Sequence, residues 1–145
     1  MSSGRVTVAR VADTLIVLGL VLFLLGLLTG MAVPAMTNPR MGVASHLQGM
    51  TNGSFLVLVG LLWPRVHLAH GWLLATAVLL VYGTYANWLA TQLGAVWGAG
   101  HRCAPGAAGS HRASPAKERV VDGLLATLAP AMVLATVALI VGVLR

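Results

Sequence analysis

Residues 14–33 read TLIVLGLVLFLLGLLTGMAV, a run of twenty residues without a charged side chain. A helix needs about twenty apolar residues to cross the hydrocarbon core of a bilayer. The chain continues with three more long apolar stretches, 41–64, 66–101 and 120–144, interrupted only by Asp122 in the last. No stretch alternates with the period of two that a membrane β-barrel requires, and hydrocarbon admits only helices or closed barrels. We therefore expect an all-α integral membrane protein.

The composition excludes the other common classes of protein. Of 145 residues, 58% are hydrophobic and 8% are charged, and the mean hydropathy is +0.89. A soluble domain carries about a quarter of its residues as charges, and disorder requires low hydrophobicity. Cys103 is the one cysteine, so no disulfide can form within the chain. The net charge of +6 is spread over short connections, so nucleic acid is not an expected partner.

We predict one membrane domain, residues 1–145, that folds as a four-transmembrane-helix bundle. The first apolar run is too long for a signal peptide, so we expect it to be retained as a helix. The expected helices span about residues 12–33, 41–64, 70–98 and 120–144, with a solvated loop at 99–119. Trp63 is expected at interface depth. Asp13 and Asp122 are expected near helix N-termini, where a carboxylate complements the helix dipole.

The basic residues do not decide the orientation in the membrane. Four lie at the end of the bundle that holds both termini and five at the other: Arg5, Arg10, Arg65 and Arg145 against Arg40, Arg102, Arg112, Lys117 and Arg119. The rule that cytoplasmic loops are richer in Lys and Arg therefore gives no answer.

Glycines form lines along three of the expected helices. At about 100° per residue the second helix aligns its glycines within about 20°, and the first and third show similar lines (Gly42, Gly49, Gly53 and Gly60; Gly19, Gly26 and Gly30; Gly83, Gly94 and Gly98). Such lines favour close helix packing. The line on the second helix is also open to a second interpretation, a bare seam that accepts a flat, rigid ligand.

His46 and Asn52 flank that glycine line on the second helix. An ionisable group within a membrane is costly and by default functional. A neutral imidazole without an acidic partner is suited to ligating a metal or haem iron, and Gly49 and Gly53 would give a porphyrin clearance. His70 is the second candidate ligand. On the third helix, Asn87 and Thr91 lie on the glycine face and are candidates for substrate contact or for hydrogen bonds between helices.

The segment 38–53, NPRMGVASHLQGMTNG, resembles the small four-helix membrane isomerases that include hydroxylaminobenzene mutase and styrene oxide isomerase. The segment 83–88, GTYANW, is similar to the mutase branch. The resemblance implies a homotrimer and a haem b near the subunit contacts, with His46 as the axial ligand and Asn52 beside the open face of the iron. The Asp and Tyr of the epoxide-isomerase branch fall here on Gly83 and Thr91, so the resemblance favours mutase chemistry.

We therefore expect an enzyme of a bacterial inner membrane that converts an aryl hydroxylamine to an ortho-aminophenol, with haem iron as a Lewis acid. Its expected partners are a small aromatic substrate and the lipid bilayer. Asn52, Asn87 and Thr91 are the expected catalytic groups, and His46, Gly49 and Gly53 the expected haem-binding ones. Three alternatives stay open: an aryl epoxide isomerase that gives an aldehyde, a haem b electron carrier with His46 and His70 as ligands, and a small transporter.

Overall fold

The computed structural model describes residues 2–145, with side chains from Val6 onward, so the side chain of Arg5 lies outside the described part. Within that range every regular element is a helix, which confirms the all-α part of the prediction. Four long helices are joined by two 3-10 turns and a one-turn helix: α1 (Ser2–Ala32), η1 (Val33–Ala35), α2 (Pro39–Leu62), η2 (Trp63–Arg65), α3 (His70–Trp97), α4 (Pro105–Ala108) and α5 (Pro115–Leu144).

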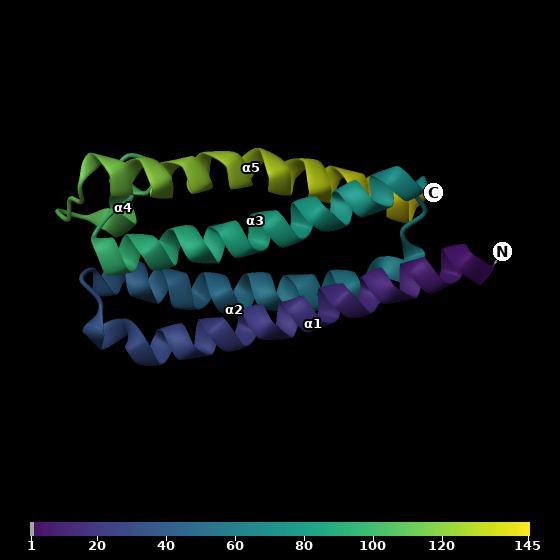
Figure 1. Cartoon of the computed structure of the whole chain (residues 1–145), viewed down its shortest axis with the longest axis horizontal. Helices are drawn as coiled ribbons and strands as arrows, with labels where there is room; N and C mark the ends of the chain where they lie inside the picture. The colour runs from purple at the N-terminus through teal and green to yellow at the C-terminus, as the bar shows by residue number, and fades with distance from the viewer. Residues whose placement is uncertain (1) are drawn as a thin grey trace.

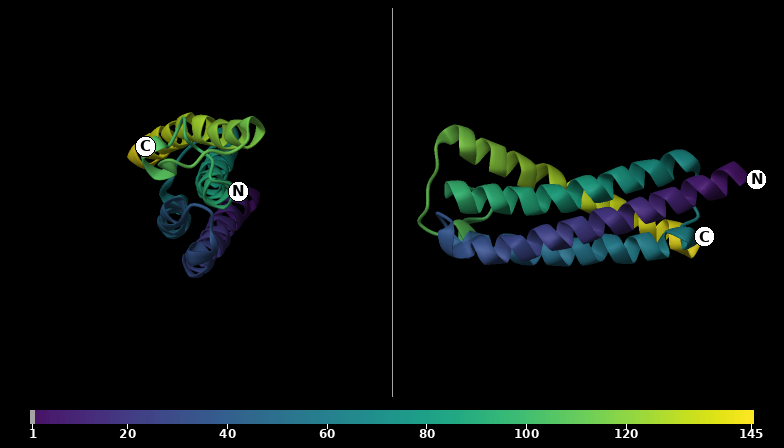
Figure 2. Two further views of the ribbon diagram at one scale, coloured as in Figure 1. Left: turned by 90° about the vertical axis from the view of Figure 1, so that its left-hand side faces the viewer. Right: turned by 60° about the horizontal axis from the view of Figure 1, so that its bottom comes forward.

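The four long helices lie side by side and run alternately up and down (Figure 1). Helix α1 packs on α2, α2 on α3, and α3 on α5. Both chain termini lie at one end of the bundle and α4 lies at the other (Figures 1 and 2). Because α2 lies between α1 and α3, it is the helix best placed to carry polar side chains away from lipid.

Among the described residues, three helical stretches are long and apolar enough to cross a membrane: Val6–Ala35, which covers most of α1 and all of η1, His70–Trp97 and Pro115–Leu144. Helix α2 has the length of a span but carries His46, Gln48 and Asn52 in its middle part. Those side chains lower its hydropathy.

Two helices begin earlier than the apolar pattern predicted. Helix α1 starts at Ser2, because nothing in residues 2–11 breaks a helix. Asp13 is therefore an exposed side chain well inside α1 and does not lie at its N-terminus, which corrects that expectation. Helix α5 starts at Pro115, whose fixed φ suits the first helical position.

The expected loop at 99–119 is more ordered than predicted, since it contains α4 and the first turn of α5. Glu118 holds it in place: its carboxylate accepts the backbone N–H groups of Gly100, His101 and Ala113 at 2.8, 3.1 and 3.1 Å. Glu118 therefore occupies the first turn of α5, where Asp122 was expected. Asp122 instead accepts the backbone N–H of Cys103 at 3.3 Å.

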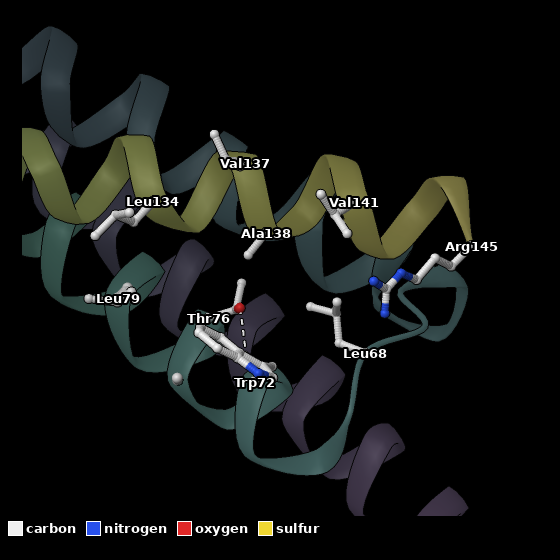
Figure 3. Close-up of a pocket in the computed structure, with 10 residues that line it drawn as sticks. Leu68, Trp72, Thr76, Leu79, Leu134, Val137, Ala138, Val141 and Arg145 are labelled. Atoms are coloured by element: carbon white, nitrogen blue, oxygen red, sulfur yellow. Dashed lines mark hydrogen bonds between the residues drawn. The ribbon is translucent and has the colours of Figure 1, made fainter.

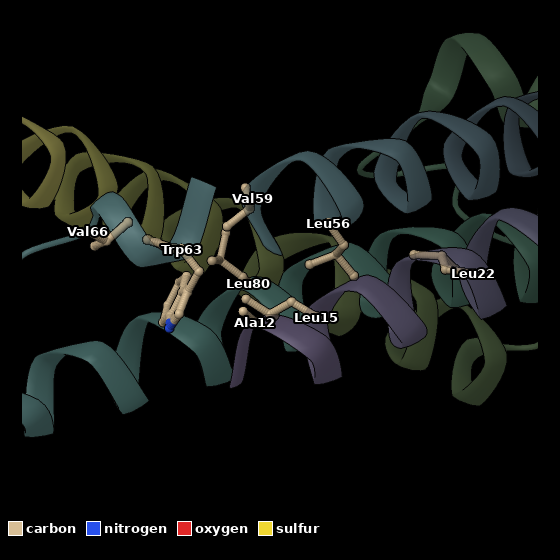
Figure 4. Packing of buried hydrophobic residues seen from close by; sticks show 9 residues of the cluster. Ala12, Leu15, Leu22, Leu56, Val59, Trp63, Val66 and Leu80 are labelled. Carbon is tan, nitrogen blue, oxygen red and sulfur yellow. The ribbon is translucent and has the colours of Figure 1, made fainter. Parts of the chain in front are cut away.

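The core lies among α1, α2 and α3 (Figure 4). Leu15, Leu22, Leu56 and Leu80 are at most 1% exposed. Trp63, which is expected at interface depth, begins the turn after α2; it is 1% exposed and packs in this cluster. The indole is buried because the turn η2, which follows α2 directly, points it inward (Figure 4).

Candidate functional site

The glycines of α1 and α2 bring the two backbones into direct contact. A Cβ atom added at Gly49 would lie 2.5 Å from the Cα of Gly26, and one at Gly53 would lie 2.5 Å from the backbone nitrogen of Phe23. No side chain fits at these distances, so the packing interpretation is confirmed. The second interpretation is corrected: within the chain, α1 fills the seam beside Gly49 and Gly53 and leaves no room there for a flat ligand.

His46 lies at the edge of this helix contact. Its Nδ1 is 2.8 Å from the carbonyl oxygen of Gly26. A carbonyl oxygen only accepts, so Nδ1 carries the proton and, in the neutral ring, Nε2 keeps its lone pair. Gly30 supplies the space for the ring, since a Cβ there would lie 2.6 Å from Nδ1. The imidazole is half-buried, and Nε2 has no hydrogen-bond partner in the described part of the chain.

This arrangement suits an axial haem ligand. A metal-binding histidine typically donates its second ring N–H to a carbonyl or carboxylate, which fixes the tautomer and the ring. Among the described residues no three His, Cys, Asp or Glu side chains gather to hold a bare metal ion. A haem asks for only one or two protein ligands. His46 therefore fits this cofactor, whereas Gly49 and Gly53 do not make room for it.

Asn52 and Asn87 are brought together by a residue that the sequence analysis did not single out. Gln48 Oε1 accepts the Nδ2–H of Asn87 at 2.9 Å and that of Asn52 at 3.3 Å. Asn52 Nδ2 also lies 3.5 Å from the backbone oxygen of Thr84. All three amides are half-buried between α2 and α3. The spacing of Gln48 and Asn52 by one helical turn was the signal that could have identified the pair.

Thr91 lies one turn beyond Asn87 but does not join the amides. Its hydroxyl donates to the backbone oxygens of Asn87 and Trp88, both at 2.9 Å, and the residue is 7% exposed. Hydroxyls in membrane helices commonly satisfy themselves in this way. This geometry favours a structural role for Thr91 over the predicted catalytic one.

A second polar cluster ties α1, α2 and α3 together one turn away. Gln92 Oε1 accepts the hydroxyl of Ser45 at 2.9 Å and that of Thr29 at 3.3 Å. The indole N–H of Trp88 donates to Thr29 at 3.2 Å. This cluster contacts neither Asn52 nor Asn87 through any hydrogen bond of the described residues.

The predicted site residues therefore form two groups on two sides of α2. His46 contacts α1, whereas Asn52 contacts Gln48 and α3. His70 belongs to neither group. It begins α3 beyond the far end of α2, and the sixteen residues from His46 to Leu62 alone rise about 24 Å. One iron cannot be ligated by both histidines of one chain, which removes that form of the electron-carrier alternative.

A groove of about 440 Å³ lies between α3 and α5 (Figure 3). Its walls are apolar side chains such as Leu79 and Leu134, with Trp72 and Arg145 toward one end. The hydroxyl of Thr76 is already bonded to the backbone oxygen of Trp72 at 2.7 Å. None of the predicted site residues lines this groove.

Comparison with known proteins gives consistent results. The family model of styrene oxide isomerase matches residues 11–144. The hydroxylaminobenzene mutase HabA of Ectopseudomonas oleovorans is 63% identical over 127 residues, which cover 88% of this chain and 94% of that protein. The mutase HabB of the same organism is 50% identical over 126 residues, covering 87% of this chain and 77% of that protein. No solved structure matches the chain.

Proposed function

The chain belongs to the styrene oxide isomerase family, and we propose that it is a membrane-embedded isomerase that converts hydroxylaminobenzene to 2-aminophenol. The observation that carries this proposal is the identity with a hydroxylaminobenzene mutase along nearly the whole chain. The half-buried amides between α2 and α3 support it, because a lipid-soluble aromatic substrate with a polar N–OH group needs a polar site within apolar surroundings.

The reaction is an internal rearrangement. The N–O bond breaks, a C–O bond forms at the neighbouring ring carbon, and the hydrogen of that carbon moves to nitrogen, so substrate and product are isomers. In the proposed mechanism Asn52 and Asn87 orient the substrate and hydrogen-bond the migrating oxygen. The apolar helices exclude bulk water, which would otherwise compete for the electron-poor ring.

We propose that His46 would hold a haem b. When bound, its iron supplies a Lewis acid that polarises the N–O bond without net oxidation or reduction. The support from this chain is the orientation of His46, whose Nδ1–H is held by Gly26 and whose Nε2 is left without a partner in the described residues. An unpaired ring nitrogen at membrane depth is costly unless a ligand or another subunit covers it.

We further propose that the protein is a homotrimer in a bacterial inner membrane, with all four long helices crossing the bilayer. Helix α2 has 24 residues, which rise about 36 Å and exceed the hydrocarbon thickness. Its polar side chains lie against α1 and α3, which explains how a helix of lower hydropathy can span. His46 and Asn52 lie on two sides of α2, so a neighbouring subunit is the natural means of bringing an imidazole to the amides.

The test is conversion of hydroxylaminobenzene by the purified protein without added nucleotide, followed by chromatography of the products. We expect 2-aminophenol and a Soret absorption band. His46→Ala should lose both, and His70→Ala, an exposed position at the start of α3, is the matched control that should keep both. Full activity in a haem-free His46→Ala protein would remove iron from the mechanism. An inactive wild-type protein that contains haem would remove the mutase function.

The family match also makes styrene oxide a second candidate substrate. The structure argues against it at the two positions that the epoxide branch uses. A side chain at Gly83 would meet Met132 of α5, and Thr91 is bonded to its own helix. Assay of phenylacetaldehyde from styrene oxide distinguishes the two activities, and we expect little or none.

A further inference from the structure

Gln48 occupies the only place where the two asparagines of the described site meet. Its Oε1 accepts one N–H from Asn87 on α3 and one from Asn52 on its own helix. A single carbonyl oxygen has two lone pairs, so these two bonds fill it. The side chain of Gln48 therefore links α2 to α3 through Asn87 and holds Asn52 on its own helix.

The contact with Thr84 fixes the direction of all three amides. The atom of Asn52 that faces the backbone oxygen of Thr84 at 3.5 Å must be the N–H₂ group, because a carbonyl oxygen there would meet another acceptor. The atom of Gln48 that bonds this nitrogen is then its oxygen, and the atom of Asn87 that bonds the same oxygen is again a nitrogen. Both asparagine Oδ1 atoms are thereby left without a partner among the described residues.

We propose that Gln48 is a positioning residue for the isomerisation: it holds Asn52 and Asn87 so that their Oδ1 atoms are presented together as acceptors. An aryl hydroxylamine carries one N–H and one O–H donor on adjacent atoms, which matches two acceptors on neighbouring side chains. This inference rests on the proposed function. It adds that the two amides act as one unit whose orientation is set by a third side chain.

Loss of that orientation has a chemical signature. In the ordered site the oxygen that leaves nitrogen returns to the ortho carbon of the same molecule. If the amides rotate freely, the leaving oxygen is held less well and water can attack the ring, which gives 4-aminophenol with oxygen from the solvent. The fraction of product labelled in H₂¹⁸O and the ratio of 2- to 4-aminophenol therefore report on amide orientation separately from the rate.

The experiment compares Gln48→Leu with Gln92→Leu in the full-length protein. Gln92 is the matched control, because it is also a glutamine bonded across helices but contacts neither asparagine. We expect Gln48→Leu to lower kcat about ten- to hundredfold, as loss of two buried hydrogen bonds implies, and to incorporate solvent oxygen. Gln92→Leu should lose thermal stability while its product keeps the substrate oxygen and the ortho position.

Gln48→Glu gives a second measurement that does not depend on the leucine variant folding. The carboxylate of the new Glu accepts the N–H groups of both Asn52 and Asn87. When the carboxyl group is protonated, its O–H occupies one of the two positions from which an asparagine N–H would be accepted. We expect solvent oxygen in the product to increase as the pH falls through the titration of this carboxyl group, with no such change in Gln92→Glu.

Two results would overturn the inference. A wild-type protein that forms 2-aminophenol, together with a Gln48→Leu or Gln48→Glu variant whose products never change, would show that Gln48 does not position the amides. A wild-type protein that does not isomerise hydroxylaminobenzene would overturn the proposed function itself, and the positioning role with it.

Discussion

Asn38 shows how much of the bundle depends on one polar side chain. Its Oδ1 accepts the backbone N–H of Met41 at 3.2 Å and caps α2. Its Nδ2 donates to the backbone oxygens of Ala107 and Ala108 at 3.0 and 3.2 Å, which attaches α4 to the start of α2. The side chain is 1% exposed, so these bonds are made inside the molecule.

We expect Asn38→Ala to destabilise the protein by about 2–4 kcal/mol, since it removes a helix cap and leaves the carbonyls of Ala107 and Ala108 without this donor. Ser114→Ala is the matched control, because Ser114 stands at the N-cap of α5 but makes no side-chain cap bond. The measurement is the thermal unfolding midpoint of both variants in the same detergent. Equal midpoints for the two variants would refute a structural role for the Asn38 side chain.

At the scale of elements, the sequence predicts helices and their faces well but not their neighbours. The spacing of the glycines along each helix, with Gly26 on α1 and Gly49 on α2, correctly indicated close packing. The same spacing was also compatible with an open ligand seam, since periodicity gives the direction of a residue on its own helix and says nothing of what fills the space opposite. The inward direction of the Trp63 indole could not be predicted for a related reason: a turn residue can point inward or outward, and η2 decides which.

We expect Gly49→Ala to force α1 and α2 apart. The new Cβ would lie 2.5 Å from the Cα of Gly26, and backbone cannot move aside as a flexible side chain can. Overpacking of this kind costs about 1–3 kcal/mol. Because His46 bonds to Gly26 in the same contact, mutase activity should fall as well.

Gly123→Ala on α5 is the control for that substitution, because nothing lies within 4 Å of a Cβ there. We expect it to leave activity unchanged and to stabilise α5 slightly, by up to about 1 kcal/mol, through helix propensity. Thermal inactivation of both variants tests the pair. A Gly49→Ala protein as stable as Gly123→Ala would mean that α1 and α2 are not in backbone contact.

At the scale of the whole molecule, the all-helical class follows from the sequence, whereas the grouping of the candidate site residues does not. His46 and Asn52 lie on adjacent faces of one helix, and their positions on that helix predicted that both side chains would point into one site. The fold inserts α1 beside His46 and α3 beside Asn52. The bond between Gln48 and Asn87 could not be predicted before α3 was placed next to α2, because the two residues are 39 positions apart.

Both termini lie at one end of the bundle and α4 at the other, and Cys103 directly precedes α4 (Figure 1). Labelling of cysteines at the two ends can therefore test how many of the long helices cross the membrane. If α2 crosses the membrane with the other three long helices, Cys103 and a cysteine at Val6 face opposite sides. If only α1, α3 and α5 cross, the two face the same side. A membrane-impermeant maleimide distinguishes the two cases in sealed vesicles, with Val6→Cys made in a Cys103→Ala background. Leu144→Cys is the control, because α5 alone separates it from Cys103 and puts it on the opposite side in either case.

Partial burial raises the pKa of the Cys103 thiol, and the hydrogen bond and charge of Asp122 raise that pKa further, although Arg102 opposes them. The reactive thiolate is therefore scarce at neutral pH, and labelling should proceed faster at about pH 8.5–9. Asp122→Asn should lower the pKa of the Cys103 thiol and speed the labelling at neutral pH without changing the side from which it occurs.

We expect Cys103 and Val6→Cys to label from opposite sides, since the helices of this bundle run its full length and α2 has the length to cross (Figure 1). Labelling of both from one side would leave α2 outside the hydrocarbon and, with it, His46 and the amides that the proposed chemistry requires there.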